Sequence, residues 1–132
     1  GSLHFMVTDE NVNSTTFIDF LERVLHDSRQ PVYLILDNHP VHKSAQVQAY
    51  VASTGGRLRI FYLPPYSPEL NPDEQVWNHV KSHGIGRMFI KGLADLKERV
   101  MARLKLLQSA PEIVRNFFRH RGVLYCSMFA NL

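Results

Sequence analysis

The chain has 132 residues, 45% of them hydrophobic, with seven prolines, seven glycines and one cysteine. This length and composition predict one compact domain, residues 1–132, with a buried core, and they exclude an internal disulfide framework or a thiolate zinc ribbon. No run approaches the roughly 20 apolar residues of a membrane span, and no signal segment opens the chain, so we expect a cytoplasmic protein without membrane contact.

The formal charge of +3 conceals an uneven distribution along the chain. Residues 1–80 contain five Lys and Arg against nine Asp and Glu, whereas residues 81–132 contain ten against three, which gives −4 and +7. A basic C-terminal part beside an acidic centre suits a protein that holds a polyanion near carboxylates, because Lys and Arg contact phosphates. A solvated basic helix face explains the same charges equally well.

The first elements are predicted from apolar spacing. The stretch LHFMV, residues 3–7, is short and apolar and is bounded by a polar run, so it predicts a strand followed by a turn. Ser14 or Thr15 is expected to cap a helix that runs to about Asp27, because apolar residues recur there at three- and four-residue intervals.

A strand, a helix and a second strand are predicted next. Residues 32–36, VYLIL, show no polar alternation, which predicts a strand covered on both faces. A helix over 43–53 and a strand over 57–63 follow, and this order predicts an α/β fold. The helix is expected to turn its alanines inward: Ala45, Ala49 and Ala52.

The second half begins with a loop that prolines dictate. Four prolines in PPYSPELNP, residues 64–72, exclude regular structure and predict a rigid loop. A helix start signal follows, with Asn71 at the cap and Glu74 three residues on. Two further helices are predicted, one with apolar residues at helical spacing over 93–107 and one that begins with a capping box, Ser109-x-x-Glu112.

Two carboxylates stand where ligands bind in α/β folds. Asp37 directly follows the strand 32–36, and Glu74 begins the helix reached from the strand 57–63. If these strands are parallel, both carboxylates can face one crevice beyond the strand ends. Oxygen-only ligation suits Mg²⁺ or Mn²⁺, and such ions can assist in-line displacement at phosphorus. Each carboxylate also has a purely structural explanation: Glu74 forms a capping box with Asn71, and Asp37 turns the chain.

The strings LDNHPVHKS and YLPPYSPELNPDEQVW contain these carboxylates and resemble the second and third acidic motifs of the DDE transposases of the insertion-sequence-630 family, relatives of the mariner elements. The likeness runs from Val7 to about Arg121, and the proline-rich block is its most specific part. It implies an RNase H-like fold, a mixed sheet flanked by helices, incomplete at the N-terminus. It also implies a bacterial transposase that uses Mg²⁺ or Mn²⁺ to cut double-stranded DNA at transposon ends and join it to a target.

Residue by residue, the resemblance implies that Asp37 is the second acidic ligand of the triad and Glu74 the third, with 36 residues between them. Asp73 stands where relatives often carry an apolar residue, and an exchange of roles with Glu74 stays open. The family's first aspartate belongs to an earlier strand, and Asp9 and Glu10 do not match it; the N-terminal helix-turn-helix part has no counterpart either. We therefore expect a C-terminal portion of the catalytic domain with little or no strand transfer by itself.

Basic residues near the two carboxylates are candidates for contact with DNA phosphates. Two follow Asp37 in the same loop, one lies seven residues after Glu74 on the same helix face, and two sit in the glycine-containing connector 84–92. These residues are His42, Lys43, Lys81, Arg87 and Lys91. A solvated position explains Lys81 at least as well as contact with DNA.

Two alternatives belong to other classes of protein. His39 and His42 form an H-x-x-H pair, and His79 and His83 lie four apart on one helix face, which is the spacing of zinc ligands, so a histidine-based zinc module is one alternative. The other is a truncated relative that only binds DNA or a full-length partner and regulates it. With part of the domain missing, exposed apolar residues would favour a homo-oligomer.

Overall fold

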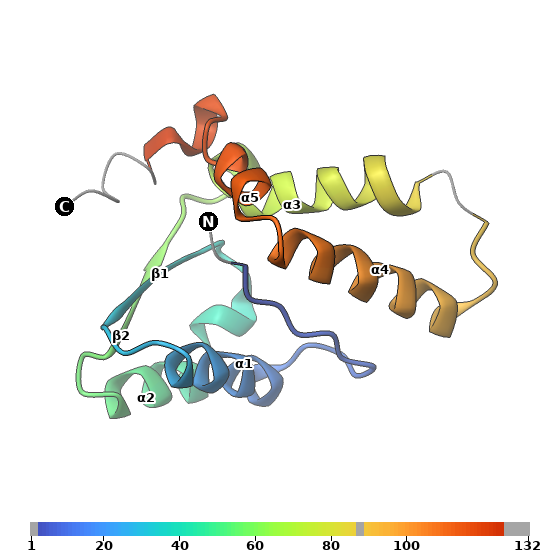
Figure 1. The fold of residues 1–132 in the computed structure, drawn as a ribbon. Helices are drawn as coiled ribbons and strands as arrows, with labels where there is room; N and C mark the ends of the chain where they lie inside the picture. Colours follow the sequence, from blue (N-terminus) through green and yellow to red (C-terminus); the bar gives the residue numbers. More distant parts are fainter. Residues whose placement is uncertain (1–2, 87–88, 126–132) are drawn as a thin grey trace. The chain divides into compact units, whose positions relative to one another are not determined.

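A computed structural model describes residues 3–86 and 89–125 of the chain (Figure 1). The chain divides into two compact units. Thr8–Ser67 form the first, here called the strand unit, and Gly1–Val7 together with Pro68–Leu132 form the second, here called the helical unit. The expectation that residues 1–132 act as a single domain stays a prediction.

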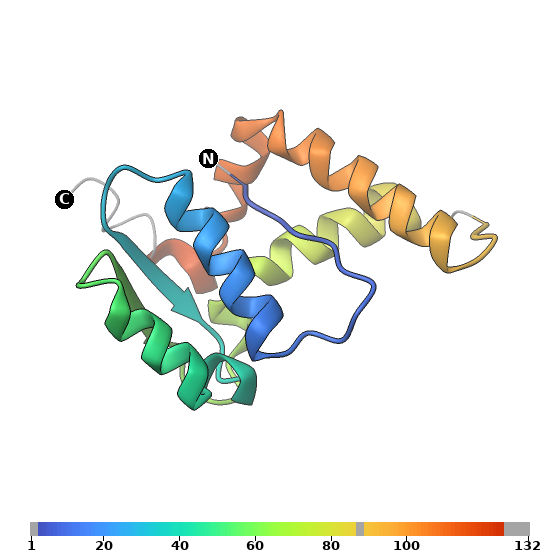
Figure 2. The same cartoon turned by 90° about the horizontal axis from the view of Figure 1, so that it is seen from below.

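The strand unit consists of two helices and two strands in the predicted order. They are α1 (Ser14–His26), β1 (Val32–Leu36), α2 (Ala45–Ser53) and β2 (Leu58–Tyr62). The two strands pair in parallel, and α1 and α2 lie next to each other on one side of them (Figures 1 and 2). The prediction of an α/β fold is thereby confirmed, with a small sheet of two strands in the described part of the chain.

The core of the strand unit lies between the helices and one face of the strands. Helical spacing in α1 brings three apolar side chains to this face, and α2 and β2 add one buried residue each. The buried residues are Phe17, Leu21, Leu25, Val47 and Leu58. Partly buried side chains of the strands, including Leu34 and Ile60, complete the layer.

The prediction that β1 is covered on both faces is wrong. Tyr33 and Ile35 are 65% and 42% exposed, and Phe61 on β2 is 52% exposed. These residues alternate with the buried ones, so they lie on the face that neither helix covers. The sequence misled because apolar residues occupy both faces, and an unbroken apolar run therefore looks the same whether one face or two are covered.

Both helices of the strand unit begin at other residues than predicted. Asn13 caps α1, since its Oδ1 accepts from the backbone N–H of Thr16 at 2.9 Å and the Thr16 hydroxyl accepts from the backbone N–H of Asn13 at 2.8 Å. Ser44 caps α2, since its Oγ accepts from the backbone N–H of Val47 at 3.3 Å. Lys43, where the helix was expected to begin, belongs to a separate 3₁₀ turn, Pro40–Lys43. The larger Val47 is fully buried on α2, while the three alanines predicted to face inward are exposed.

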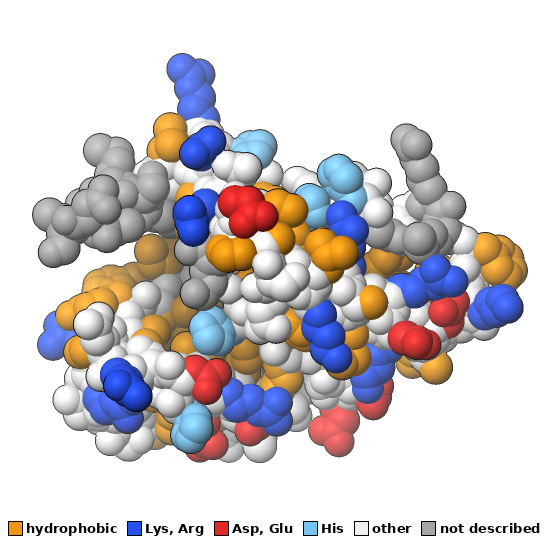
Figure 3. Space-filling model, viewed as in Figure 1, with side chains coloured by type: hydrophobic (Ala, Val, Ile, Leu, Met, Phe, Trp, Pro, Cys, Tyr) orange, Lys and Arg blue, Asp and Glu red, His pale blue; other side chains and the backbone are white. Residues whose placement is uncertain are grey.

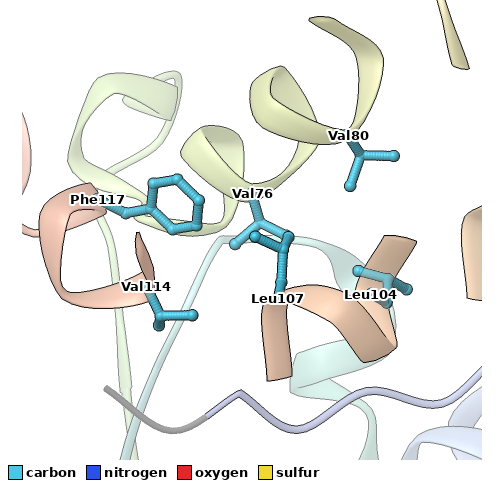
Figure 4. Packing of buried hydrophobic residues seen from close by; sticks show 6 residues of the cluster. All are labelled: Val76, Val80, Leu104, Leu107, Val114 and Phe117. Carbon is cyan, nitrogen blue, oxygen red and sulfur yellow. The ribbon is translucent and has the colours of Figure 1, made fainter. Parts of the chain in front are cut away.

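The described residues of the helical unit form three α-helices around a second core. α3 (Asp73–Val80) continues into a π-helical turn (Lys81–Ile85), and α4 (Leu93–Gln108) and α5 (Pro111–Phe117) follow. The capping box predicted at Ser109 is wrong, because no side chain caps α5 and the Ser109 hydroxyl donates back to the carbonyl oxygen of Leu106 at 2.8 Å. Two side chains from each helix point toward one another (Figure 4). They are Val76, Val80, Leu104, Leu107, Val114 and Phe117. No helix in the described ranges is long and apolar enough to cross a membrane.

The predicted strand over residues 3–7 is not a strand. Its alternate residues Leu3, Phe5 and Val7 pack against the core of the helical unit, and Gln108 donates a side-chain hydrogen bond to the carbonyl oxygen of Leu3 at 3.0 Å. The alternation that suggested a strand therefore reflects one buried side of an extended segment, which pairs with no other strand in the described residues.

Candidate active site

Asp37 lies at the carboxyl end of β1, as predicted. The strands are parallel, with Leu36 opposite Tyr62, and the backbone N–H of Leu63 donates to the carbonyl oxygen of Leu36 at 2.7 Å. Asp37 and the proline-rich segment that follows Leu63 therefore leave the sheet at the same edge. This is the edge where open α/β sheets bind their ligands.

The carboxylate of Asp37 is held through one of its two oxygens. Oδ1 accepts a hydrogen bond from the backbone N–H of His39 at 3.1 Å and lies 2.9 Å from Nδ1 of His42. The bond to His39 is the chain-turning role expected as a structural explanation of Asp37. Oδ2 takes part in no hydrogen bond or ion pair with the described residues, and the side chain is 55% exposed. One oxygen is thus committed to the fold and the other is accessible.

His42 is itself supported from several sides. Its ring lies 4.7 Å from the ring of Phe17 between centroids, and its side chain is only 19% exposed. The Tyr62 hydroxyl donates to the carbonyl oxygen of His42 at 2.8 Å, and the ammonium of Lys43 stands 4.9 Å from the centre of the Tyr62 ring. The loop after β1 is therefore tied to both α1 and the end of β2.

Asn38 adds an unsatisfied polar atom to this loop. Its side-chain Oδ1 is buried and has no hydrogen-bond partner among the described residues. Buried acceptors in native folds are nearly always paired, so this oxygen calls for a donor that the described side chains do not supply. The loop thus places side-chain oxygens at two successive positions, with Asp37 exposed and Oδ1 of Asn38 buried.

Glu74 is the second residue of α3, and its side chain is exposed. The capping box suggested as its structural explanation does not form in the described structure, because the backbone N–H of Asn71 donates to the carbonyl oxygen of Pro68 at 3.0 Å and not to the carboxylate of Glu74. Instead, Oδ1 of Asn71 accepts from the backbone N–H of Asp73 at 3.1 Å, and the carbonyl oxygen of Asn71 accepts from the N–H of Glu74 at 3.2 Å. The carboxylate of Glu74 is therefore not used to begin the helix.

Asp37 belongs to the strand unit and Glu74 to the helical unit. A metal site shared by these two carboxylates accordingly stays a prediction. Within the described ranges, no group of three or more His, Cys, Asp and Glu side chains is arranged to hold a metal ion.

His79 and His83 are engaged with each other and with α4. Their rings stack at 4.3 Å between centroids with 18° between planes, and Nε2 of His79 lies 3.0 Å from a guanidinium nitrogen of Arg103. Burial lowers the pKa of His79, and the nearby His83 and Arg103 lower it further. Because Arg103 can only donate, Nε2 of a neutral His79 is the acceptor. This contact uses the lone pair that a zinc ion would need, so the pair gives the zinc alternative no support.

The basic residues proposed as DNA contacts fall at exposed positions where the structure describes them. Lys43, Lys81 and Lys91 are exposed, whereas His42 is largely covered and directs Nδ1 toward Asp37. Arg87 lies outside the described residues. Figure 3 shows Lys and Arg side chains scattered over the visible face rather than gathered in one patch.

Sequence reasoning placed His42 near Asp37 but missed the residues that hold it, Phe17 and Tyr62. It also missed the contact between His79 and Arg103. Phe17 and Arg103 are 25 and 24 residues from their histidine partners, and no local pattern marks such pairs. The spacing of two histidines four residues apart on a helix shows that their rings can meet. It does not show which group binds the ring nitrogens, here Arg103 at Nε2 of His79.

The structure is that of an α/β protein in which a carboxylate, Asp37, lies just beyond the carboxyl end of two parallel strands. A family model described as "DDE superfamily endonuclease" matches residues 1–97. The chain therefore belongs to the DDE superfamily of endonucleases. This membership and the relative below confirm the resemblance to the insertion-sequence-630 family.

A relative among curated proteins is "Insertion element IS630 uncharacterized 39 kDa protein" of Shigella sonnei. It is 34% identical over 67 residues, which are 49% of this chain and 19% of the relative. The chain thus spans about a fifth of the length of the curated relative that it matches. No solved structure matches the chain with significance.

Proposed function

We propose that this chain is part of the RNase H-like catalytic domain of a DNA transposase, in which Asp37 and Glu74 hold Mg²⁺ or Mn²⁺. The observation that carries the proposal is the position of Asp37 at the carboxyl edge of two parallel strands, with Oδ2 accessible. Glu74 supports it, since its exposed carboxylate does not cap α3. The proposed reaction is cleavage of phosphodiester bonds at transposon ends and transfer of the strand to target DNA.

The residues present fit a hard divalent cation. Asp37 and Glu74 offer carboxylate oxygens, the ligands that Mg²⁺ and Mn²⁺ prefer, and the buried Oδ1 of Asn38, the residue after Asp37, is a further oxygen acceptor. A bound ion would activate the attacking oxygen and offset charge on the phosphate. Asp37 would contribute a carboxylate already fixed by its loop, and Glu74 a carboxylate on a longer side chain at the start of a helix.

Double-stranded DNA is the proposed partner, and its phosphates are the proposed ligands of the basic residues. Lys43, Lys81 and Lys91, together with Arg87, would contact the backbone, and His42 could do so only through Nε2. Strand transfer requires a third acidic ligand, which we assign to no residue of this chain, so we expect the chain alone to be inactive. We further propose that it acts in the bacterial cytoplasm and associates with further copies of itself.

A Mn²⁺ titration followed by NMR tests the shared site. Paramagnetic broadening of backbone amides in the isotope-labelled chain is expected around both Asp37 and Glu74 at the same Mn²⁺ concentrations. Asp37→Asn or Glu74→Gln should remove the broadening at both places. Two matched controls are Asp73→Asn, next to Glu74, and Asp27→Asn, at the end of α1 in the strand unit, and both should leave it unchanged.

The possible outcomes separate the proposals. Loss of broadening with Asp73→Asn rather than Glu74→Gln would exchange the roles of these neighbours. If the broadening persists in Asp37→Asn, the proposal that Asp37 and Glu74 share a metal ion is wrong. If Mn²⁺ has no effect while Zn²⁺ shifts the signals of His39 and His42, the zinc module replaces the transposase site.

A further inference from the structure

We propose that His42 is a positioning residue, which fixes the carboxylate of Asp37 so that Oδ1 stays in the fold and Oδ2 alone is presented to a metal ion. This inference rests on the proposed function, in which Asp37 is a metal ligand. It assigns His42 a role different from contact with a DNA phosphate, because Nδ1 is taken by Asp37.

The protonation of His42 follows from the atoms around it. Nδ1 lies 2.9 Å from Oδ1 and 3.4 Å from the main-chain carbonyl oxygen of Asp37. An unprotonated nitrogen would place its lone pair against two oxygens, whereas an N–H can donate to them, so Nδ1 carries the proton. Together with the backbone N–H of His39, two donors therefore converge on the same side of the carboxylate.

The imidazole can act as a fixed support because its own position is constrained. Phe17 packs against one side of the His42 ring, and the Tyr62 hydroxyl donates to the main-chain carbonyl oxygen of His42. The backbone N–H of His42 also donates to the carbonyl oxygen of His39 at 3.0 Å, which closes the turn that carries both donors. Rotation of the Asp37 side chain would break its contacts with this turn, so one rotamer is favoured.

The choice of oxygen has a consequence for the metal. Oδ1 of Asp37 has two lone pairs, and the donors from His39 and His42 use both, so Oδ2 is the oxygen left for an ion. Single-oxygen ligation suits the octahedral geometry of Mg²⁺ and Mn²⁺, whereas Ca²⁺ readily accepts both oxygens of a carboxylate. Loss of the His42 contact should therefore weaken Mn²⁺ binding more than Ca²⁺ binding.

Three substitutions of His42 separate its ring from its donor. His42→Phe keeps an aromatic ring against Phe17 and removes Nδ1. His42→Asn places an amide N–H close to the position of Nδ1, whereas His42→Gln places one near Nε2. His39→Asn is the control for loss of the ring contact between His39 and His42, whose centroids lie 5.7 Å apart. It keeps the backbone N–H that donates to Asp37, and asparagine can still accept from the N–H of Val41, as His39 does at 3.2 Å.

The first measurement needs no metal. Three-bond couplings from the backbone N and C′ of Asp37 to its Cγ report the side-chain rotamer. We expect one rotamer in the wild type, in His39→Asn and in His42→Asn, and rotamer averaging in His42→Phe and His42→Gln. A single unchanged rotamer in both His42→Phe and His42→Gln would overturn the proposal.

The second measurement is Mn²⁺ affinity from the broadening of the amides next to Asp37. His42→Phe should weaken it about 10-fold, the lower end of the effect of removing a group that orients a metal ligand, and His42→Asn should restore most of the loss. Ca²⁺ affinity, measured by competition with Mn²⁺, should fall less. If His42→Phe does not fold, as judged by its amide spectrum, the comparison of His42→Asn with His42→Gln decides in the same way.

Failure of this inference is distinct from failure of the proposed function. If Asp37→Asn abolishes Mn²⁺ binding but His42→Phe changes neither affinity nor rotamer, Asp37 is a ligand and His42 does not position it. If Asp37→Asn has no effect on Mn²⁺ binding, the metal site is wrong, and the metal-free rotamer measurement still decides whether His42 orients Asp37.

Discussion

Leu106 and Leu107 are neighbours in α4 that test how the helical unit is stabilised. Leu107 is fully buried among the side chains of α3 and α5, whereas Leu106 is 46% exposed. Leu107→Ala removes a buried side chain and leaves a cavity, which should lower the free energy of unfolding by about 3 kcal/mol. Leu106→Ala loses much less burial, and the better helix propensity of alanine offsets part of that, so its effect should stay below about 1 kcal/mol.

Urea unfolding followed by circular dichroism gives the free energy of unfolding of both variants and the wild type. Residue-resolved hydrogen exchange adds where the loss occurs, and a change of about 3 kcal/mol corresponds to roughly 100-fold faster exchange of the best-protected amides in α4. Equal losses in the two variants, or a loss below about 1 kcal/mol for Leu107→Ala, would contradict the packing described for this core.

Three further predictions concern pH, a helix cap and a close approach. Because burial lowers the pKa of His79 from its usual 6.5, the neutral ring stabilises the fold fully above that pH, and this contribution is lost as the pH falls through the lowered pKa. When the pH is lowered from about 7.5 to about 5.5, the urea midpoint should therefore fall more in the wild type than in His79→Gln. An equal fall in both would contradict the role of the neutral His79 ring in stability. Asn13→Ala removes the cap of α1 and should lower the free energy of unfolding in urea by about 1 kcal/mol. Asn11 does not cap this helix, so Asn11→Ala should lower it by less than about 0.5 kcal/mol. Gly122→Ala should lower the urea unfolding free energy by about 2 kcal/mol, because the added Cβ runs into the carbonyl oxygen of Glu69, and an unchanged value would argue against that approach.

The sequence predicted those parts of the fold that depend on local periodicity and the order of elements. β1 and β2 were expected from their apolar runs, and their parallel pairing met the condition that places Asp37 at a ligand-binding edge. The same apolar signal failed at residues 3–7, where it reflects packing against helices rather than pairing with a strand. Apolar spacing records which side of a segment is buried, but the partner that buries it lies far away in the chain.

In the candidate site too, local sequence patterns predicted some side-chain roles correctly and others wrongly. A capping box at Glu74 and a turn at Asp37 were both plausible from local patterns, and only the turn forms in the described structure. The difference arises because the backbone N–H of Asn71, from which Glu74 would accept in a capping box, donates to the carbonyl oxygen of Pro68, and the side chain of Asn71 accepts from Asp73 and not from Glu74. Competition between neighbouring polar groups for one set of N–H donors is settled by small differences in backbone direction, which a sequence pattern does not contain.

If Asp37 and Glu74 share an ion as proposed, they contribute to it in different ways. The carboxylate of Asp37 is held before any ion arrives, so little conformational freedom remains to be lost when Oδ2 binds. Glu74 has a longer side chain, an exposed position and no hydrogen bond from its carboxylate to the described residues, so most of its ordering would occur on binding. Affinity should therefore depend more sharply on the geometry around Asp37, and this is why the support supplied by His42 is the feature of the site most open to a decisive test.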